Sequence, residues 1–304
     1  MPKQEIVNHM TDDRLLTLRS GELELVLAPA AGCSTLRFDY RLGSEKAEVF
    51  RGCDGVPASP VDAANFPLVP YVNRIRGGRF SFRGREVTIA ENLDGDSSPL
   101  HGQGWLAAWT VVSAGESEAD LRFRHQAGEW PWSYEARQLF TLGPRGLTVL
   151  LSCLNLSDEA MPCGLGQHPY FNCTSRTILD TRVTDVWTID ETVLPVEKVP
   201  ATGRFDLSKR QICGQDLDHG FAGWGGVARI DTPGLPFRVE ISTSDACFFQ
   251  VYSPRAGGFF AAEPVTHANA ALNEPEEQWA ELGLRVLEPG EEMSLSARFE
   301  VIPV

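Results

Sequence analysis

Short runs in which apolar and polar side chains alternate recur along the chain, and this pattern restricts its fold more than any other feature. The clearest runs are residues 22–27, 79–83, 237–241 and 293–301, separated by Gly, Pro, Asn and Asp. A period of two is typical of antiparallel strands with one buried face. Residues 146–156 form a longer apolar run, which predicts a central strand covered on both faces. The pattern predicts an all-β protein.

Helical signals are few, and the clearest one covers residues 275–282. Pro275 suits the first helical position, and Trp279 and Leu282 share a face three residues apart. No composition break, low-complexity tract or repeat divides the 304 residues, so we expect one domain spanning 1–304. A strand-rich chain of this size is expected to curl into a sandwich or barrel.

The composition restricts partners and location. With 27 basic and 41 acidic residues, the formal net charge is −14, which disfavours nucleic acid and anionic membranes as partners. The seven cysteines are odd in number and contain no C-x-x-C pair, as is common in a reducing cytoplasm. Residues 1–19 contain no apolar leader, and no stretch approaches the roughly 20 apolar residues of a membrane span. We expect a soluble cytoplasmic monomer or homodimer that binds a small molecule.

Two histidines and one glutamate occur in contexts that suit acid–base chemistry. His168 lies between glycines and aromatic residues, and is either a general acid in a cleft or a structural histidine bonded to a carbonyl. His101 lies on a glycine-rich turn, where it is either accessible or simply solvated. Glu263 follows the apolar run Phe-Phe-Ala-Ala, so it is either a functional rim carboxylate or part of a structural salt bridge. Reference pKa values of about 6.5 for His and about 4.3 for Glu allow the two groups to exchange protons near neutral pH.

An arginine cluster follows the segment 66–71. Arginine presents fixed donors that suit hydroxyl, carboxylate or phosphate oxygens. A solvated face is expected for Arg76 and Arg79, whereas Arg74 beside Asn73 is the candidate for ligand binding.

Other chemistries have less support. A metal site built from His101, His168, His267 and Glu263 is chemically conceivable, but no short metal-binding spacing is present and we expect none. The chain has no glycine-rich phosphate loop and no G-x-S-x-G elbow, which argues against nucleotide binding and serine hydrolysis. Several aromatic residues could stack under a ligand ring or belong to the core. They are Trp105, Trp132, Phe171 and Trp224.

Five segments, in this order along the chain, resemble the aldose 1-epimerase (galactose mutarotase) family. They are Asn73-Arg74-Ile75, Leu100-His101-Gly102, His168-Pro169-Tyr170-Phe171, Glu263-Pro264-Val265-Thr266 and Leu287-Glu288-Pro289-Gly290-Glu291. The resemblance covers residues from about 66 to the C-terminus. It implies a single antiparallel β-supersandwich, no cofactor and a cleft lined by the motif residues.

The resemblance also implies roles for individual residues. Glu263 looks like the base that takes the proton from the anomeric hydroxyl. His168 looks like the acid that protonates the ring oxygen, with His101 as a second histidine beside it. The implied substrate-binding residues are Asn73, Arg74, Asp218 and Gln250. An anionic Glu263 facing a cationic His168 would favour ionisation of both, relative to desolvation alone.

The implied function is aldose 1-epimerase activity on a free hexose or related aldose. Two alternatives stay open: a hexose-6-phosphate 1-epimerase, which would need Arg76, Arg79 or another cation in the cleft, and a non-catalytic sugar-binding or regulatory module. Gln103-Gly104-Trp105 after His101 and the short segment from Pro254 to Glu263 depart from galactose-type enzymes. These departures leave the identity of the sugar open.

Overall fold

The computed structural model describes residues 15–304, and its largest element is a nine-stranded antiparallel sheet. In spatial order its strands are β18 (Arg210–Gln211), β15 (Ile178–Thr181), β20 (Val227–Asp231), β21 (Phe237–Ser242), β25 (Glu292–Pro303), β11 (Gly146–Asn155), β10 (Tyr134–Gly143), β9 (Glu118–His125) and β8 (Thr110–Ala114). Strand β11 lies between β10 and β25, and none of its ten residues is exposed. This confirms the central strand predicted from the apolar run.

A second sheet of eight strands carries most of the chemistry described below. Along the sheet its strands are β17 (Pro195–Pro200), β16 (Asp185–Ile189), β19 (Leu217–Ala222), β22 (Phe248–Ser253), β23 (Phe259–Val265), β13 (Gly166–Gln167) and β5 (Pro67–Leu68), and β14 (Tyr170–Asn172) also pairs with β23. The longer strands β19, β22 and β23 are neighbours at its centre, so residues far apart in sequence share one surface.

Smaller elements complete the described part of the chain. A four-stranded sheet consists of β1 (Leu16–Ser20), β2 (Leu23–Ala28), β3 (Ser34–Leu42) and β4 (Glu45–Glu48). One two-stranded sheet pairs β6 (Arg79–Phe82) with β7 (Arg85–Thr88). Another pairs β12 (Met161–Cys163) with β24 (Arg285–Leu287). The helical elements are η1 (Pro60–Asp62), η2 (Arg76–Gly78), η3 (Gly104–Leu106), η4 (Gly203–Phe205), η5 (Ala271–Asn273) and α1 (Glu276–Trp279).

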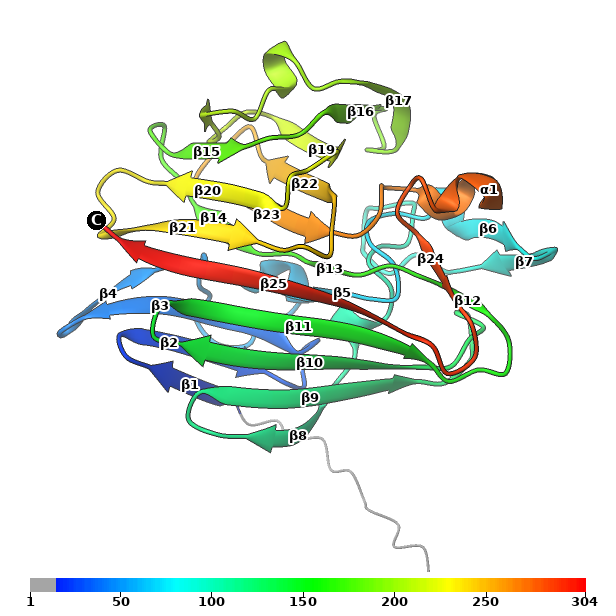
Figure 1. Cartoon of the computed structure of the whole chain (residues 1–304), viewed down its shortest axis with the longest axis horizontal. Coiled ribbons are helices and arrows are strands. Elements are labelled where there is room, and N and C mark those ends of the chain that lie inside the picture. Colours follow the sequence, from blue (N-terminus) through cyan, green and yellow to red (C-terminus); the bar gives the residue numbers. More distant parts are fainter. Residues whose placement is uncertain (1–14) are drawn as a thin grey trace, which may run out of the picture.

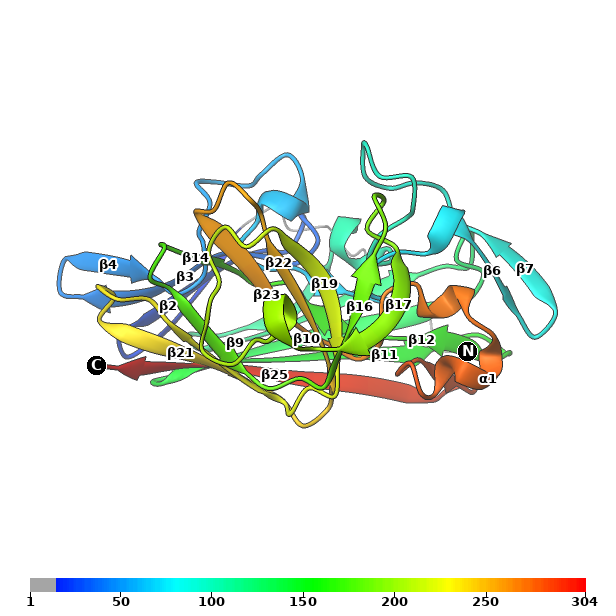
Figure 2. The same cartoon turned by 90° about the horizontal axis from the view of Figure 1, so that it is seen from above.

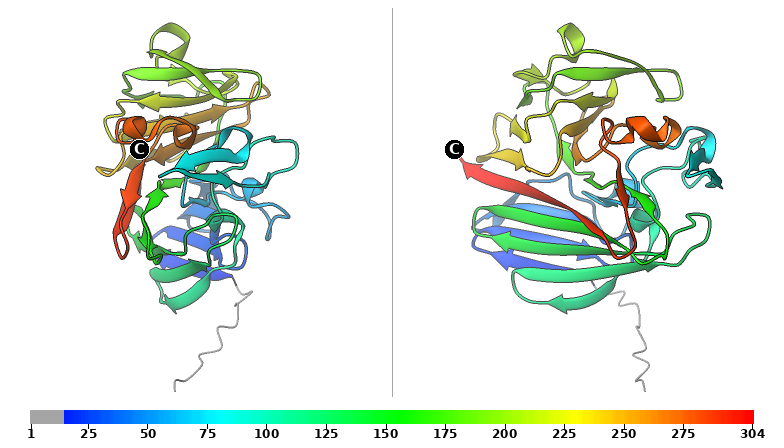
Figure 3. Two further views of the ribbon diagram at one scale, coloured as in Figure 1. Left: turned by 90° about the vertical axis from the view of Figure 1, so that its right-hand side faces the viewer. Right: turned by 45° about the vertical axis from the view of Figure 1, so that its right-hand side comes forward.

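The sheets stack face to face around the core. The blue strands of the four-stranded sheet lie behind the green strands β9 to β11 in Figure 1, and Figure 2 shows β22 and β23 above the plane of β25 and β11. Figure 3 shows the same layers from two further sides. One buried cluster joins them, with Leu25 from β2, Leu151 from β11, Phe249 from β22 and Phe299 from β25. The expected antiparallel all-β sandwich is confirmed.

The predicted helix is shorter than expected. Residues 275–282 contain only the four-residue α1, and Pro275 is its N-cap rather than its first residue. The turn closes because Gly283 adopts φ +84°, which brings the Leu284 N–H onto the Trp279 carbonyl at 2.9 Å. A side chain at Gly283 would overlap the Thr266 carbonyl, so the chain needs glycine there.

Two expectations concern termini and membranes. None of the helices among residues 15–304 is long and apolar enough to cross a membrane. The expectations made for residues 1–14, including the missing apolar leader, lie outside the described residues.

Candidate active site

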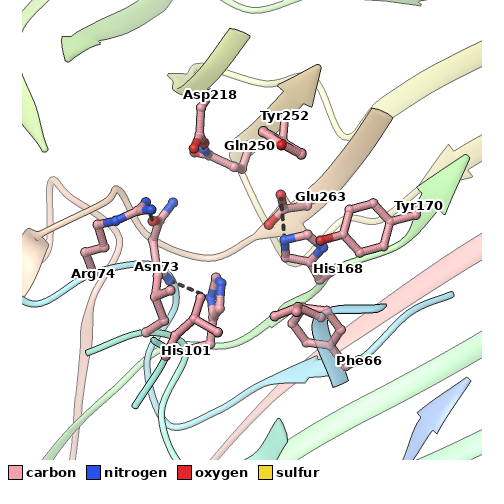
Figure 4. A pocket seen from close by; sticks show the side chains of 13 residues that line it. Phe66, Asn73, Arg74, His101, His168, Tyr170, Asp218, Gln250, Tyr252 and Glu263 are labelled. Carbon is pink, nitrogen blue, oxygen red and sulfur yellow. Dashed lines mark hydrogen bonds and ion pairs between the residues drawn. The ribbon is translucent and has the colours of Figure 1, made fainter. Parts of the chain in front are cut away.

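A cavity of about 270 Å³ on the eight-stranded sheet gathers polar and aromatic residues from distant parts of the chain (Figure 4). It is lined by Val61, Phe66, Asn73, Arg74, Leu93, Leu100, His101, His168, Tyr170, Asp218, Gln250, Tyr252 and Glu263. Every residue that the family resemblance implies for the site lies in this lining. Arg76 and Arg79 are exposed and do not line it, in agreement with the solvated face expected for them.

The central strands place three polar side chains on one face. Gln250 of β22 pairs with Glu263 of β23 on one side and with Gly220 of β19 on the other. Because side chains alternate along a strand, Asp218, two residues before Gly220, faces the same way. The Gln250 amide donates to Asp218 Oδ1 at 2.8 Å. A Cβ at Gly220 would lie 3.2 Å from Gln250 Oε1, so glycine leaves room for this contact.

His168 faces Glu263 across the floor of the cavity. Its Nε2 lies 3.3 Å from Glu263 Oε1, and both side chains are almost fully buried. The His168 backbone N–H donates to the Phe66 carbonyl at 3.1 Å, and the two rings stack at 4.5 Å with an interplanar angle of 18°. Among the described residues Nδ1 has no hydrogen-bond partner, so Glu263 is the polar group that determines where the imidazole proton lies.

Burial controls the protonation of this pair. It raises the pKa of Glu263 well above the ordinary value, with a further rise from Asp218 and an opposing effect of Arg74. Burial likewise lowers the pKa of His168 to about 3. Desolvation is the largest influence on both pKa values, and it favours the uncharged form of each group rather than the ionic pair suggested by the sequence. Both pKa shifts favour a pair that holds one proton between its two groups and carries no net charge.

His101 is held as a neutral hydrogen-bond donor. Its Nδ1 accepts the Asn73 backbone N–H at 3.0 Å, which leaves the ring proton on Nε2. The His101 backbone N–H in turn donates to the Asn73 carbonyl at 2.9 Å, and both residues have positive φ, 60° and 58°. Burial, the neighbouring His168 and Arg74 hold the pKa of His101 well below its usual range. The ring therefore cannot act as a cationic acid at neutral pH.

The guanidinium of Arg74 is fixed by neighbours. Asp96 accepts from its Nε at 2.9 Å and lies 2.8 Å from its Nη2, and Asn73 Oδ1 accepts from Nη1 at 3.1 Å. The Arg74 backbone N–H donates to Asn269 Oδ1 at 3.0 Å. Asp96 was not predicted from the sequence, because it lies in a polar loop with no pattern of its own.

The aromatic wall differs from the one considered from the sequence. Trp105, Trp132, Phe171 and Trp224 are all buried in the core and do not line the cavity. The wall is formed instead by Phe66, Tyr170 and Tyr252. Alternation along β14 explains the division, because Tyr170 faces the cavity while its neighbour Phe171 packs against Phe50 in the core.

A chain of buried amides begins at the residues that precede Phe66 and His168 in the sequence. The preceding residues, Asn65 and Gln167, bond side chain to side chain at 2.7 Å, and Gln167 donates onward to Gln138 of β10 at 3.0 Å. All three amides are buried. They tie the segment that carries His168 to the nine-stranded sheet, which restricts its movement relative to Glu263.

His267 belongs to the framework of the protein rather than to the cavity. Its Nε2 accepts the Val72 N–H at 2.9 Å and its Nδ1 lies 2.8 Å from the Ala268 carbonyl, so Nδ1 carries the proton. A side chain at Gly164 would overlap the His267 ring, which accounts for glycine there. Within the part of the chain that the structure describes, no three metal-ligating side chains lie together.

We expect His267 to make stability depend on pH. Burial lowers its pKa to about 4, whereas the unfolded residue has a pKa of about 6.5, so only the unfolded chain binds the proton between these values. The free energy of unfolding should fall by about 2 kcal/mol from this group between pH 7 and pH 5. Urea unfolding of wild type and His267→Gln at both pH values measures this. Between pH 7 and pH 5 the free energy of unfolding of the variant should fall by less than that of wild type, and the difference should be the contribution of His267. An equal fall in both proteins would contradict the lowered pKa assigned to His267.

Comparison with known proteins identifies the family. The family model for aldose 1-epimerase matches residues 14–300. The chain belongs to the aldose 1-epimerase family. It is 35% identical over 249 residues to the uncharacterised protein YphB of Escherichia coli K12, covering 77% of this chain and 83% of that protein. The uncharacterised protein YihR of the same organism is 24% identical over 297 residues, covering 90% of each chain.

Solved structures agree with the fold. A candidate aldose 1-epimerase from Escherichia coli K12 superposes with a TM-score of 0.85 at 30% identity, covering 96% of this chain and 99% of that one. A galactose mutarotase-like protein from Clostridium acetobutylicum superposes with a TM-score of 0.82 at 17% identity, covering 95% of both chains. The fold is therefore of the galactose mutarotase-like kind.

Proposed function

We propose that the protein interconverts the α and β anomers of a free hexose or related aldose. The observation that carries this proposal is the 3.3 Å contact between His168 Nε2 and Glu263 Oε1 inside a cavity of about 270 Å³. Anomer exchange requires one proton to leave O1 and one to reach the ring oxygen. A carboxylate and an imidazole on one cavity floor supply both transfers.

The proposed reaction starts from the ionic form of the pair. Glu263 takes the proton from the O1 hydroxyl while His168 donates its proton to the ring oxygen, and the bond between C1 and the ring oxygen breaks. The open-chain aldehyde turns about its C1–C2 bond. Reversal of both proton transfers then closes the ring on the other face. No atom is gained or lost, and the proposal assigns no cofactor.

The burial of the pair has a consequence for this cycle. Ring opening leaves Glu263 protonated and His168 neutral, which are the forms that desolvation favours in both residues. The environment therefore stabilises the open-chain stage relative to the ionic starting form. Hydrogen bonds from bound sugar hydroxyls to the Glu263 carboxylate favour the ionic form before reaction.

The remaining lining groups are proposed to hold the sugar. His101 Nε2–H, Asn73 and the fixed Arg74 guanidinium supply donors on one side, and the Asp218–Gln250 pair supplies an acceptor and a donor on the other. The phenyl ring of Phe66 and the phenols of Tyr170 and Tyr252 add apolar faces, which sugars use for stacking.

The charges favour a free sugar over its 6-phosphate. Arg74 is already paired with Asp96, and the lining also contains two carboxyl groups, Asp218 and Glu263. A phosphate dianion would meet no unpaired cation among these lining residues.

The proposed location is a reducing cytoplasm, which the seven free thiols support. The proposed oligomeric state is a monomer or homodimer.

Rates on freshly dissolved sugars test the proposed function. We expect polarimetry of α-glucose and α-galactose to show mutarotation well above the buffer rate, with much slower turnover of glucose 6-phosphate. Faster reaction of the phosphate would favour the hexose-6-phosphate alternative. Binding of the free sugars without any rate above buffer would instead indicate a sugar-binding or regulatory module.

A further inference from the structure

The hydroxyl of Tyr170 lies in the cavity beside the proton-transfer pair. Tyr170 lines the cavity and is only 7% exposed. Its ring centroid lies 4.7 Å from that of His168, and Figure 4 shows the hydroxyl end of the ring directed toward His168. Within residues 15–304 this hydroxyl forms no hydrogen bond to the protein. A buried phenol without a protein partner is available to a ligand in the cavity.

We propose that Tyr170 is a further catalytic residue, whose hydroxyl donates a hydrogen bond to the sugar ring oxygen, and that Arg51 is the positioning residue that holds it there. This inference rests on the proposed function, because the ring oxygen has to lie beside His168. Negative charge develops on that oxygen as its bond to C1 breaks. A fixed donor stabilises this charge more than it stabilises the starting sugar.

The surroundings of Tyr170 make its phenol a donor rather than an acid. Burial raises the pKa of Tyr170 above the ordinary value, the charge of Glu263 raises it further, and Arg51 has an opposing effect. The hydroxyl therefore stays protonated throughout the neutral pH range and donates at every stage of the cycle. The proton that reaches the ring oxygen still comes from His168, so the exchange with Glu263 stays balanced.

Arg51 is attached to Tyr170 through its backbone and through its side chain. The Arg51 backbone N–H donates to the Tyr170 carbonyl at 2.8 Å. The guanidinium lies over two rings, with Cζ 4.8 Å from the Tyr170 centroid and 4.4 Å from the Phe259 centroid. These two rings pack edge to face at 5.8 Å. The attraction between a guanidinium and aromatic faces therefore holds the phenol in one orientation.

The charge of Arg51 reaches the cavity although its side chain does not line it. Among residues 15–304 the acceptor for its guanidinium is the Asp62 carbonyl, 3.4 Å from Nη2, and no carboxylate pairs with it. Burial lowers the pKa of His168 to about 3, and the positive charge of Arg51 contributes in the same direction. A cation beside the phenol also favours donation by its O–H group. Arg51 thus acts on the sugar through Tyr170.

Kinetics of Tyr170→Phe test the hydroxyl. The substrate is whichever of fresh α-glucose and α-galactose reacts faster with wild type. We expect kcat to fall by about a hundredfold, as on removing one donor to a developing negative charge, with KM nearly unchanged. Tyr40→Phe is the matched control, because Tyr40 packs against Phe237 and does not line the cavity. It should keep the wild-type kcat.

Arg51 variants test the positioning role. Arg51→Ala should lower kcat about tenfold, the size expected for loss of a cation–π contact. In the Tyr170→Phe background the same change should have little effect, because no hydroxyl is left to position. Arg51→Lys keeps the charge without the planar group and should recover part of the loss. Arg83→Ala is the control, since its guanidinium lies over the Phe82 ring at 5.3 Å, outside the cavity.

The outcomes separate this inference from the proposed function. A wild-type kcat in Tyr170→Phe would overturn the catalytic role, and so would a raised KM at unchanged kcat, which indicates binding alone. An Arg51→Ala loss of equal size with and without the hydroxyl would overturn the positioning role. Both results leave the proposed function standing while wild type exchanges anomers. A wild type without any rate above buffer would overturn the proposed function and this inference together.

Discussion

Replacing Glu263 with glutamine should lower the rate of anomer exchange by about a thousandfold, within the roughly 10²- to 10⁴-fold range of one positioned acid–base group. Glutamine has nearly the same shape, but its amide cannot accept the O1 proton. Polarimetry of fresh α-sugar measures the loss. Near-normal turnover would show that Glu263 is not the base.

The same variant separates catalysis from folding. Because burial disfavours the charged form of Glu263, a neutral amide in its place should leave the thermal unfolding temperature at pH 7 unchanged or higher. Glu281→Gln is the matched control, since this side chain is 76% exposed and lies outside the cavity. It should keep both the wild-type rate and the wild-type stability. A strongly destabilised Glu263→Gln would contradict the protonation state assigned to the residue.

Replacing His168 with asparagine should lower the rate by roughly 10²- to 10⁴-fold, because no group then delivers a proton to the ring oxygen. The pH profile should also change shape. In wild type the pair keeps one proton across the neutral range, so kcat/KM should be flat there. In the variant Glu263 must lose its own proton to act as a base, and burial raises its pKa, so the residual rate should rise with pH.

The profile distinguishes this role from a structural one. A variant that only loosened the cavity would keep the flat profile of wild type at a reduced rate. His125→Asn is the control, because His125 is partly buried at the end of β9 and lies outside the cavity. A flat profile in His168→Asn would contradict the assignment of His168 as the acid.

Much of the fold could be predicted from local pattern. Alternation in residues 22–27, 237–241 and 293–301 reports one buried face, and these runs became β2, β21 and β25. The apolar run at 146–156 identified β11 as central, since both of its faces are covered. The predicted helix was too long because α1 ends at Trp279 and the chain closes the turn through Gly283, whose positive φ leaves no signal in the apolar pattern. Glycine is needed there because a side chain would overlap the Thr266 carbonyl.

The site was predictable only in part. Short motifs located the lining histidines, Glu263 and the four implied binding residues, but the sequence has no signal for which strands become neighbours. The four are Asn73, Arg74, Asp218 and Gln250. The register that sets Gln250 beside Glu263, and so brings in Asp218, arises from packing of the whole sheet. Asp96 and Tyr252 were not assigned to the site, because no local pattern shows that their side chains lie beside Arg74 or line the cavity. The sequence could not give the protonation of the pair either, because burial is a property of the folded chain.

The central claim is that Glu263 and His168 work as one proton-transfer unit on a sugar. NMR magnetisation exchange between the two anomers measures this directly for wild type, both single variants and Glu263→Gln/His168→Asn. When two groups act as a unit, removing the second lowers the rate only slightly further once the first has been removed. The double variant should therefore be no more than about threefold slower than the slower single variant. The claim would be contradicted if the rate reductions of the two single variants multiply in the double variant. It would also be contradicted if the double variant keeps the wild-type rate.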